Sequence, residues 1–295
     1  DRYVGAFAED KAEFIRRDGV TTTTLDCVVS PEDNAEVRRV TISNGGLTAR
    51  EIEVTSYSEL VLAQAAADTT HPAFSKMFVE TEYVAELETL LATRRRRSTS
   101  DPEIWMAQFM LGQGATLGGI EFETDRVQFL GIGNTNRMPA ALTGIVRLSR
   151  TTGIVHDPIF SLRQRLRVPA VRKVRCTLWT VVASSREAVL DLVDRHRQPV
   201  AFDRAMMLAW TQAQIQLRHL SIGTADANLY QTLASHLLYA NQALRAPARV
   251  LMQDMGPRAA LVPHGISGYR PLLLLRIADL ADVQLVTQTL QAVAF

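Results

Sequence analysis

The residue composition changes sharply near Ser184, and this change constrains the fold more than any other feature of the sequence. Residues 1–184 hold 21 of the 26 threonines, whereas the remaining 111 residues hold 19 of the 34 leucines. Threonine favours half-buried strands, and leucine favours helices. The sequence therefore predicts a mainly β domain over residues 1–184, followed by an α part.

Short apolar runs separated by glycine and proline mark the strands of the first part. We expect strands at Thr21–Ser30, Ile104–Leu111, Gly144–Ser149, Ser161–Val168 and Val171–Val182. Pro169 stands between the last two runs and predicts the turn that joins them. Because strands do not alternate with helices here, the pattern favours an antiparallel sandwich over a doubly wound parallel sheet.

Two further runs, Val37–Ser43 and Glu51–Tyr57, flank the sequence Asn44-Gly45-Gly46. The second run alternates polar and apolar residues with the period of a strand. Asn-Gly supplies the positive φ angles that a tight turn needs. These features predict that the two runs pair as a β-hairpin.

The helical part begins with Ser184-Ser-Arg-Glu187, the pattern of a capping box. This pattern predicts a helix at 185–197 that stops before Pro199. We expect further helices at 202–220, 225–245, 271–278 and 282–294, and an extended piece at 248–252. The chain opens on Asp1 without an initiating methionine and ends at Phe295 within a helical pattern, so we expect a longer polypeptide.

Each of the three tryptophans, Trp105, Trp179 and Trp210, lies in an apolar segment. An aromatic ring can stack on a sugar, but an apolar segment favours a place in the core. The helix expected at 202–220 sets Trp210 on one apolar stripe with Leu217. We therefore expect all three side chains to be core residues.

The charges nearly cancel, with 32 basic and 31 acidic residues, so we expect no nucleic-acid partner. The longest aliphatic run, Leu272–Leu275, is far shorter than the roughly 20 residues that span a bilayer, and we expect no membrane insertion. Cys27 and Cys176 form no Cys-x-x-Cys pair, which excludes a disulfide framework and a structural zinc site. This cysteine usage favours a reducing, cytoplasmic location.

The usual catalytic signatures are missing: the sequence has no Walker loop, HExxH or GxSxG motif, and Gly131-Ile-Gly133 is only part of a dinucleotide fingerprint. The six histidines include no pair at metal-ligand spacing, so we expect neither a metal nor an organic cofactor. His264 lies in a loop between expected helices, where a binding role and a structural role both stay open. Arg94–Arg97 has no interleaved aromatic residues, so a solvated strand end or hairpin tip is favoured over a phosphate-binding patch.

Seven stretches carry a resemblance to a known family: Ala12–Gly19, Val37–Asn44, Thr55–Glu59, His71–Glu82, Asp157–Arg163, Ala209–Gln214 and His264–Gly268. They are similar to the family-94 glycoside phosphorylases, formerly glycosyltransferase family 36. The similarity is closest to the phosphorylase-type domain of cyclic β-1,2-glucan synthases. The stretches follow the order of the family over almost the whole chain.

This resemblance implies three parts: a β super-sandwich of the galactose-mutarotase type over 1–184, a helical linker over 185–247, and the start of an (α/α)₆ barrel over 248–295. It also implies inverting chemistry on β-linked glucosides. One carboxylic acid protonates the leaving oxygen, while inorganic phosphate, the family's co-substrate, attacks the anomeric carbon from the opposite face. The product of such enzymes is α-glucose 1-phosphate.

The family's catalytic acid and phosphate-binding loops come later in the barrel, so the resemblance implies no catalytic residue in this chain. It implies a sugar subsite at His264, Ser267, Gly268, Tyr269 and Arg270. Relatives carry Asp at the position of Tyr269, and a phenol cannot supply the two charged acceptors of a carboxylate.

Three functions follow as hypotheses. The first is part of a phosphorylase or cyclic-glucan-synthase type protein that acts on β-glucan oligosaccharides, with this chain inactive alone. The second is a glucan-binding or interaction module without chemistry, and the third is a degenerate remnant. The apolar faces of the last helices favour self-association or packing with the rest of a parent protein.

Overall fold

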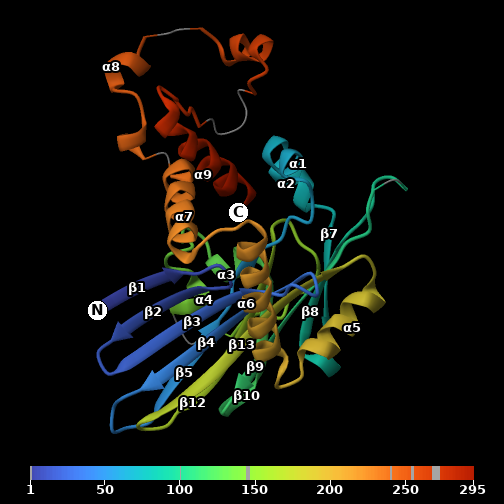
Figure 1. Ribbon diagram of the computed structural model, residues 1–295. Coiled ribbons are helices and arrows are strands. Elements are labelled where there is room, and N and C mark those ends of the chain that lie inside the picture. The colour runs from blue at the N-terminus through green and yellow to red at the C-terminus, as the bar shows by residue number, and fades with distance from the viewer. Residues whose placement is uncertain (1, 100, 144–146, 240, 254–255, 268–272) are drawn as a thin grey trace. The chain divides into compact units, whose positions relative to one another are not determined.

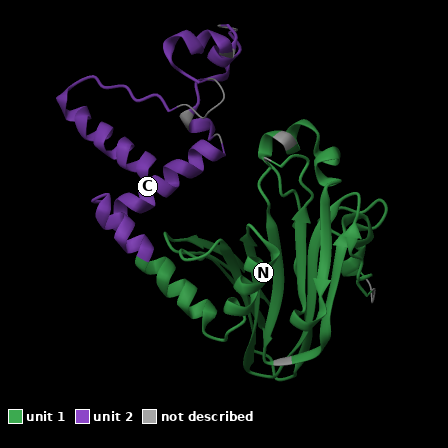
Figure 2. Ribbon diagram, turned by 90° about the vertical axis from the view of Figure 1, so that its right-hand side faces the viewer, with its two compact units in different colours: residues 1–211 green, residues 212–295 purple. Residues whose placement is uncertain are grey.

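The computed structural model describes residues 2–99, 101–143, 147–239, 241–253, 256–267 and 273–295. The chain divides into two compact units, Asp1–Thr211 and Gln212–Phe295, shown in different colours in Figure 2. Within the described residues, no helix is long and apolar enough to cross a membrane.

A long antiparallel sheet dominates the first unit (Figure 1). Over the described residues it has nine strands in the order β1-β2-β3-β4-β13-β9-β8-β7-β11. The strands are β1 (Arg2–Phe7), β2 (Ala12–Asp18), β3 (Thr21–Val29), β4 (Ala35–Asn44), β7 (Val79–Val84), β8 (Thr89–Arg94), β9 (Trp105–Gln113), β11 (Gly153–Ile154) and β13 (Arg172–Ala183).

A smaller antiparallel sheet lies against the long one, with the order β10-β12-β5 and with β6 also paired to β12. Its strands are β10 (Ala115–Asp125), β12 (Pro158–Val168), β5 (Arg50–Thr55) and β6 (Ser58–Glu59). The antiparallel class and the strands predicted at Thr21–Ser30, Ile104–Leu111, Ser161–Val168 and Val171–Val182 are confirmed. The strand predicted at Gly144–Ser149 is wrong over 147–149, which have no regular structure, and residues 144–146 lie outside the described residues.

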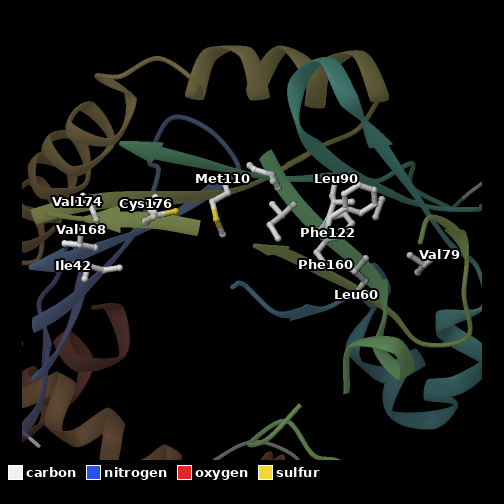
Figure 3. Close-up of a cluster of buried hydrophobic side chains, with 14 residues drawn as sticks. Ile42, Leu60, Val79, Leu90, Met110, Phe122, Phe160, Val168, Val174 and Cys176 are labelled. Carbon is white, nitrogen blue, oxygen red and sulfur yellow. The ribbon is translucent and has the colours of Figure 1, made fainter. Parts of the chain in front are cut away.

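The main hydrophobic core lies between the two sheets (Figure 3). Met110 and Cys176 reach it from the long sheet, and Phe122 and Phe160 reach it from the small sheet. Side chains alternate in direction along a strand, so the neighbouring residues of the long sheet point to its other face. That face is also buried, and it forms a second cluster with the helices that follow β13.

Two helices cover the outer face of the long sheet: α5 (Arg186–His196) and the first turns of α6 (Ala201–His219). Val189 and Val193 of α5 are fully buried against this face. The predicted helix start is off by one residue, because Ser185 rather than Ser184 caps α5 through its bond to the Ala188 amide. The shorter helices of this unit are α1 (Ala65–Thr70), α2 (Pro72–Lys76), η1 (Ala85–Leu87), α3 (Arg126–Leu130) and α4 (Ala140–Thr143).

The second unit is helical and is described by itself. It contains the end of α6 followed by α7 (Thr224–Leu238), η2 (Gln242–Leu244), α8 (Ala248–Leu251), η3 (Arg258–His264), η4 (Leu280–Asp282) and α9 (Val283–Ala294). Ala227 and Tyr230 of α7 form a small core with Leu217 and Ile222. The side chain of Tyr230 donates a hydrogen bond of 3.0 Å to Gln291 of α9, which ties the two helices together.

Three predictions for this unit are wrong. Residues 248–252 are not extended, since α8 occupies most of them. Residues 273–278 are not helical, and 271–272 lie outside the described residues. Leu274 is 88% exposed, and a short helix with little tertiary packing is not stable in water. The helix predicted at 225–245 ends at Leu238, while α6 and α9 confirm those predicted at 202–220 and 282–294.

The predicted hairpin between Val37–Ser43 and Glu51–Tyr57 is also wrong. Strand β4 pairs with β3 and β13 in the long sheet, whereas β5 pairs with β12 in the small sheet. The connection after Asn44 therefore carries the chain from one sheet to the other. The turn at Pro169 joins β12 to β13 and makes a second such crossing.

Asn44 binds these two crossings together. Its buried amide group donates to the carbonyl oxygens of Thr48, Val168 and Pro169 at 2.8, 3.3 and 3.3 Å, and its Oδ1 accepts from the Gly46 amide. The Asn-Gly pair thus serves a sheet-to-sheet crossing rather than a tight hairpin turn, because each of the two runs finds its partners in a different sheet.

The tryptophans differ in their environment. Trp179 is 1% exposed and Trp105 packs half-buried at the edge of the same cluster, which confirms Trp179 as a core residue. Trp210 is 56% exposed, so its prediction as a core residue is wrong. The long sheet buries the apolar stripe of α6 only over its first turns, which contain Phe202 and Ala205. The periodicity of the sequence does not reveal where along the helix this burial ends.

This contrast gives a matched pair of substitutions. Trp179→Ala leaves a large cavity in the core and should lower the free energy of unfolding by about 3–5 kcal/mol. Trp210→Ala should lower it by about 1 kcal/mol or less, since the side chain is mostly exposed. Urea unfolding followed by circular dichroism measures both, and equal losses would contradict the two burial assignments.

Candidate functional site

Three of the stretches that resemble the family converge in one ionic cluster beside the small sheet. Lys76 Nζ lies 2.7 Å from Asp157 Oδ1, and Arg126 Nη1 lies 3.1 Å from Asp157 Oδ2. Arg126 also pairs with Glu59 at 3.3 Å. The cluster therefore links α2 to β6, which contains Glu59, to Arg126 at the start of α3, and to Asp157 just before β12.

Tyr57 completes this cluster. Its hydroxyl accepts a bond of 3.0 Å from Arg126 Nε and donates one of 2.9 Å to Glu59 Oε1. Burial raises the pKa of the Tyr57 phenol, which keeps the proton that this donation requires. All five groups of the cluster are engaged with one another, so the cluster orders this end of the sandwich.

Arg94 fastens the same helix to the long sheet. Its Nη1 donates to the backbone carbonyl of Ser75 in α2, and a longer contact of 3.5 Å reaches the carbonyl of Val61. Helix α2 is thus bonded on one side to Asp157 and on the other side to the end of β8. Asp157, from a family stretch, and Arg94, from outside these stretches, together hold this helix in place.

A large cavity of about 1190 Å³ opens next to Arg94, within the first unit. Arginines and carboxylates both line it, and Leu62, Ile104 and Leu192 add an apolar part to the wall. The charged lining residues are Glu32, Asp33, Arg94, Arg95, Arg96, Arg97, Asp101, Glu103, Asp191 and Arg195. Five positive and five negative side chains therefore balance, so the cavity suits a neutral, polar ligand.

Several of these carboxylates already have arginine partners. Asp33 lies 2.7 Å from Arg195, and Glu103 lies 3.9 Å from Arg96 and accepts a bond of 2.8 Å from the Trp105 indole. Asp33 and Glu103 are therefore engaged with neighbouring side chains and are not presented to the cavity as free proton donors.

His196 lies behind Asp33 and is buried. Its ring stacks on Trp179 with 4.2 Å between the ring centroids, and its Nε2 lies 3.0 Å from Asp33 Oδ2. Burial lowers the pKa of His196 and outweighs the opposing effect of the Asp33 charge. The imidazole is therefore neutral near pH 7 and supports the wall of the cavity from the core side.

The run Arg94–Arg97 lies where the sequence predicted, at the start of the loop that joins β8 to β9. Arg95, Arg96 and Arg97 are exposed, which confirms the solvated hairpin tip, while Arg94 is half-buried. The run nevertheless lines a cavity, and two aromatic rings lie against it. Phe74 and Phe78 lie well before the arginine run in the sequence. The run therefore contains no interleaved aromatic residues, and folding brings the two rings against it.

The residues of the subsite predicted from the resemblance belong to the second unit, whereas the residues that line the large cavity belong to the first. His264 ends η3 and is exposed, and Ser267 is exposed just after it. Gly268, Tyr269 and Arg270 lie outside the described residues. The role of these five residues therefore stays a prediction. Among the described residues, no group of three His, Cys, Asp or Glu side chains could hold a metal ion.

Comparison with known proteins gives the family of this chain. The family model described as glycosyl hydrolase 94, supersandwich domain, matches residues 1–199. The cyclic β-(1,2)-glucan synthase NdvB of Rhizobium meliloti (strain 1021) is 40% identical over 292 residues. The match covers 99% of this chain and 10% of NdvB, so the chain spans about a tenth of that relative.

Solved structures resemble the fold only distantly. A human-microbiome protein assigned as a kojibiose phosphorylase matches 70% of this chain and 23% of its own, with 6% identity and a TM-score of 0.41. A polysaccharide lyase matches 61% of this chain and 23% of its own, with 9% identity and a TM-score of 0.35. Neither likeness is close enough to bear on function.

The ionic cluster gives a testable difference between two ion pairs. The pair Lys76–Asp157 is 14% and 24% exposed, whereas the pair Arg186–Glu82 is 43% and 46% exposed. Double-mutant cycles to alanine should give a coupling of about 1 kcal/mol for the first pair and below about 0.5 kcal/mol for the second. Urea unfolding measures each cycle, and a coupling no larger in the cluster than at the exposed pair would show that the cluster does not hold α2.

Proposed function

The chain belongs to the glycosyl hydrolase 94 family, and on this premise we propose that it forms the β-sandwich and the entry to the helical barrel of a carbohydrate-active protein that processes β-linked glucans. The observation that carries the proposal is the family match over residues 1–199, the part that folds into the two facing sheets. The 40% identity to a cyclic β-(1,2)-glucan synthase supports β-1,2-linked glucan as the substrate of the whole protein.

The reaction of that whole protein is phosphorolysis or transfer of β-linked glucosyl units with inversion. A carboxylic acid protonates the leaving oxygen, and phosphate attacks the anomeric carbon from the opposite face. We assign the general acid to the part of the barrel that follows this chain in the family. The pairing of Asp33 and Glu103 with arginines supports this view, because neither is presented as a free proton donor.

We place the sandwich at 1–184, the helical linker at 185–247 and the start of the (α/α)₆ barrel at 248–295. On this view, His264, Ser267, Gly268, Tyr269 and Arg270 contribute to one sugar subsite, where Tyr269 replaces a carboxylate of the relatives. The exposed side chains of Leu290 and Val293 in α9 support packing against further parts of the same protein or a second copy. The reducing character of the cysteine usage supports a cytoplasmic location.

The purified chain should therefore release no glucose 1-phosphate from β-1,2-glucooligosaccharides and phosphate. An enzymatic assay for glucose 1-phosphate measures this, with a protein-free blank and a complete family-94 phosphorylase as the positive control. Release above the blank would place a general acid within residues 1–295 and overturn the assignment of the acid to a later part of the barrel.

A second function is favoured by the large cavity in the first unit. Its volume of about 1190 Å³ and its balanced charged lining suit several sugar rings, since paired carboxylates and guanidinium groups offer both acceptors and donors to hydroxyls. In this case the chain binds glucan without performing chemistry.

Calorimetric titration with β-1,2-glucooligosaccharides tests this second function. Binding to the cavity should weaken about fivefold or more in Glu103→Gln, because a charged acceptor in the wall becomes neutral. The matched control Glu86→Gln removes the same charge at an exposed residue of η1 and should bind as the wild type does. Absence of measurable binding, or an equal loss in both variants, would exclude a glucan site in this cavity.

A further inference from the structure

A second, smaller cavity of about 390 Å³ lies between α1, α2 and the end of β8. Arg94 and Arg97 line it from the hairpin tip, and His71 and Phe74 line it from the helical segment. Both arginines also line the large cavity, so the two cavities share this wall. Unlike the large cavity, the small one has no carboxylate in its lining, as far as the described residues go.

Aromatic rings contact both arginines, and the Ser75 carbonyl also accepts a hydrogen bond from Arg94. The Arg97 guanidinium carbon lies 5.3 Å from the Phe74 ring centroid and 5.6 Å from that of Phe78. The Arg94 guanidinium carbon lies 5.3 Å from the Phe78 centroid. A ring face orients a guanidinium group but leaves its charge uncompensated.

Neither Arg94 nor Arg97 forms an ion pair with any residue that the structure describes. Arg96 and Arg195, which line only the large cavity, do have such partners in Glu103 and Asp33. Two arginines without an ion-pair partner among the described residues, Arg94 and Arg97, thus face the same small cavity.

The electrostatics of Arg94 agree with this geometry. Burial lowers the pKa of Arg94, the positive charge of Arg97 lowers it further, and the negative charge of Asp101 opposes these two effects without cancelling them. The two guanidinium groups therefore repel each other across the shared wall. An anion placed against both of them would relieve this repulsion and accept hydrogen bonds from their N–H groups.

We propose that the small cavity binds a tetrahedral oxyanion of the phosphate type, either as the free ion or as the phosphate group of a small sugar. Arg94 and Arg97 supply the charged donors, because the planar guanidinium group matches the oxygens of such an anion. Phe74 forms the apolar side of the cavity, and Ser75 holds Arg94 in place. The proposal stands on this cavity alone and does not depend on the function proposed above.

Isothermal titration at low ionic strength tests the site with three probes: inorganic phosphate, glucose 1-phosphate and glucose. Phosphate or glucose 1-phosphate should saturate at millimolar concentration, and glucose should not. Saturation by phosphate at least as tight as by glucose 1-phosphate identifies the free ion as the ligand. Tighter binding of glucose 1-phosphate identifies the sugar-borne group, with its sugar accommodated beside the shared wall.

Three variants locate the binding. Arg97→Gln should weaken it about tenfold, because one charged donor is lost. Ala66→Glu adds a carboxylate to the lining without removing any arginine and should abolish binding, which keeps the test valid if the first variant is poorly folded. Arg96→Gln is the matched control, since it removes the same charge from the same loop but lies outside the small cavity.

The proposal is overturned by any of three results. Neither anion saturates the wild type, glucose binds as tightly as glucose 1-phosphate, or Arg96→Gln loses as much affinity as Arg97→Gln. The last result would mean that the anion responds only to the general charge of the hairpin tip. Thermal melting of each variant confirms that the compared proteins are folded.

Discussion

Burial of both faces of the long sheet at its central strands is the constraint on which the rest of the structure depends. Along β13, Cys176 points toward the small sheet and Trp179 points toward the helices, and both are almost fully buried. A sheet covered on both faces needs two layers of partners. The small sheet supplies one, and α5 with the beginning of α6 supplies the other. The crossings between the sheets and the capped start of α5 follow from this arrangement, because the chain must change layers at those places.

The polar features gather where α1 and α2 are inserted before β7. Helix α2 is too short to be stable by itself, and its position rests on bonds at its C-terminal end, from Arg94 to Ser75 and from Lys76 to Asp157. The same anchoring shapes the two cavities on either side of Arg94. One cavity has balanced charges and the other has only positive ones. The carboxylates of the β8–β9 loop, Asp101 and Glu103, line only the large cavity. The two cavities therefore favour ligands of different charge.

The sequence predicted the strands of this fold better than their partners. Short apolar runs separated by glycine and proline located β3, β9, β12 and β13, since such runs mark the chain segments that reach a core. Such a run does not record which sheet its strand joins, and for this reason the hairpin turn predicted at Asn44-Gly45 is wrong. The helix predicted at 271–278 is wrong over the described residues 273–278, where Leu273 and Leu274 are exposed rather than packed in a core. Only part of the candidate site could be predicted from the sequence. The arginine run stands out there, but only folding brings Phe74 and Phe78 against it.

Asn44 and Gly45 carry one more consequence. In a flexible peptide the asparagine of an Asn-Gly pair deamidates quickly. The glycine amide nitrogen attacks the side-chain carbonyl carbon of asparagine, and ammonia is lost. Here the Gly45 amide donates to the carbonyl of Val20 at 2.8 Å, and the asparagine side chain is 2% exposed and fully engaged. The fold withholds both the attacking nitrogen and the water that the deamidation needs. The native fold therefore protects Asn44 from deamidation, and Asn44 is the residue that joins the two connections between the sheets.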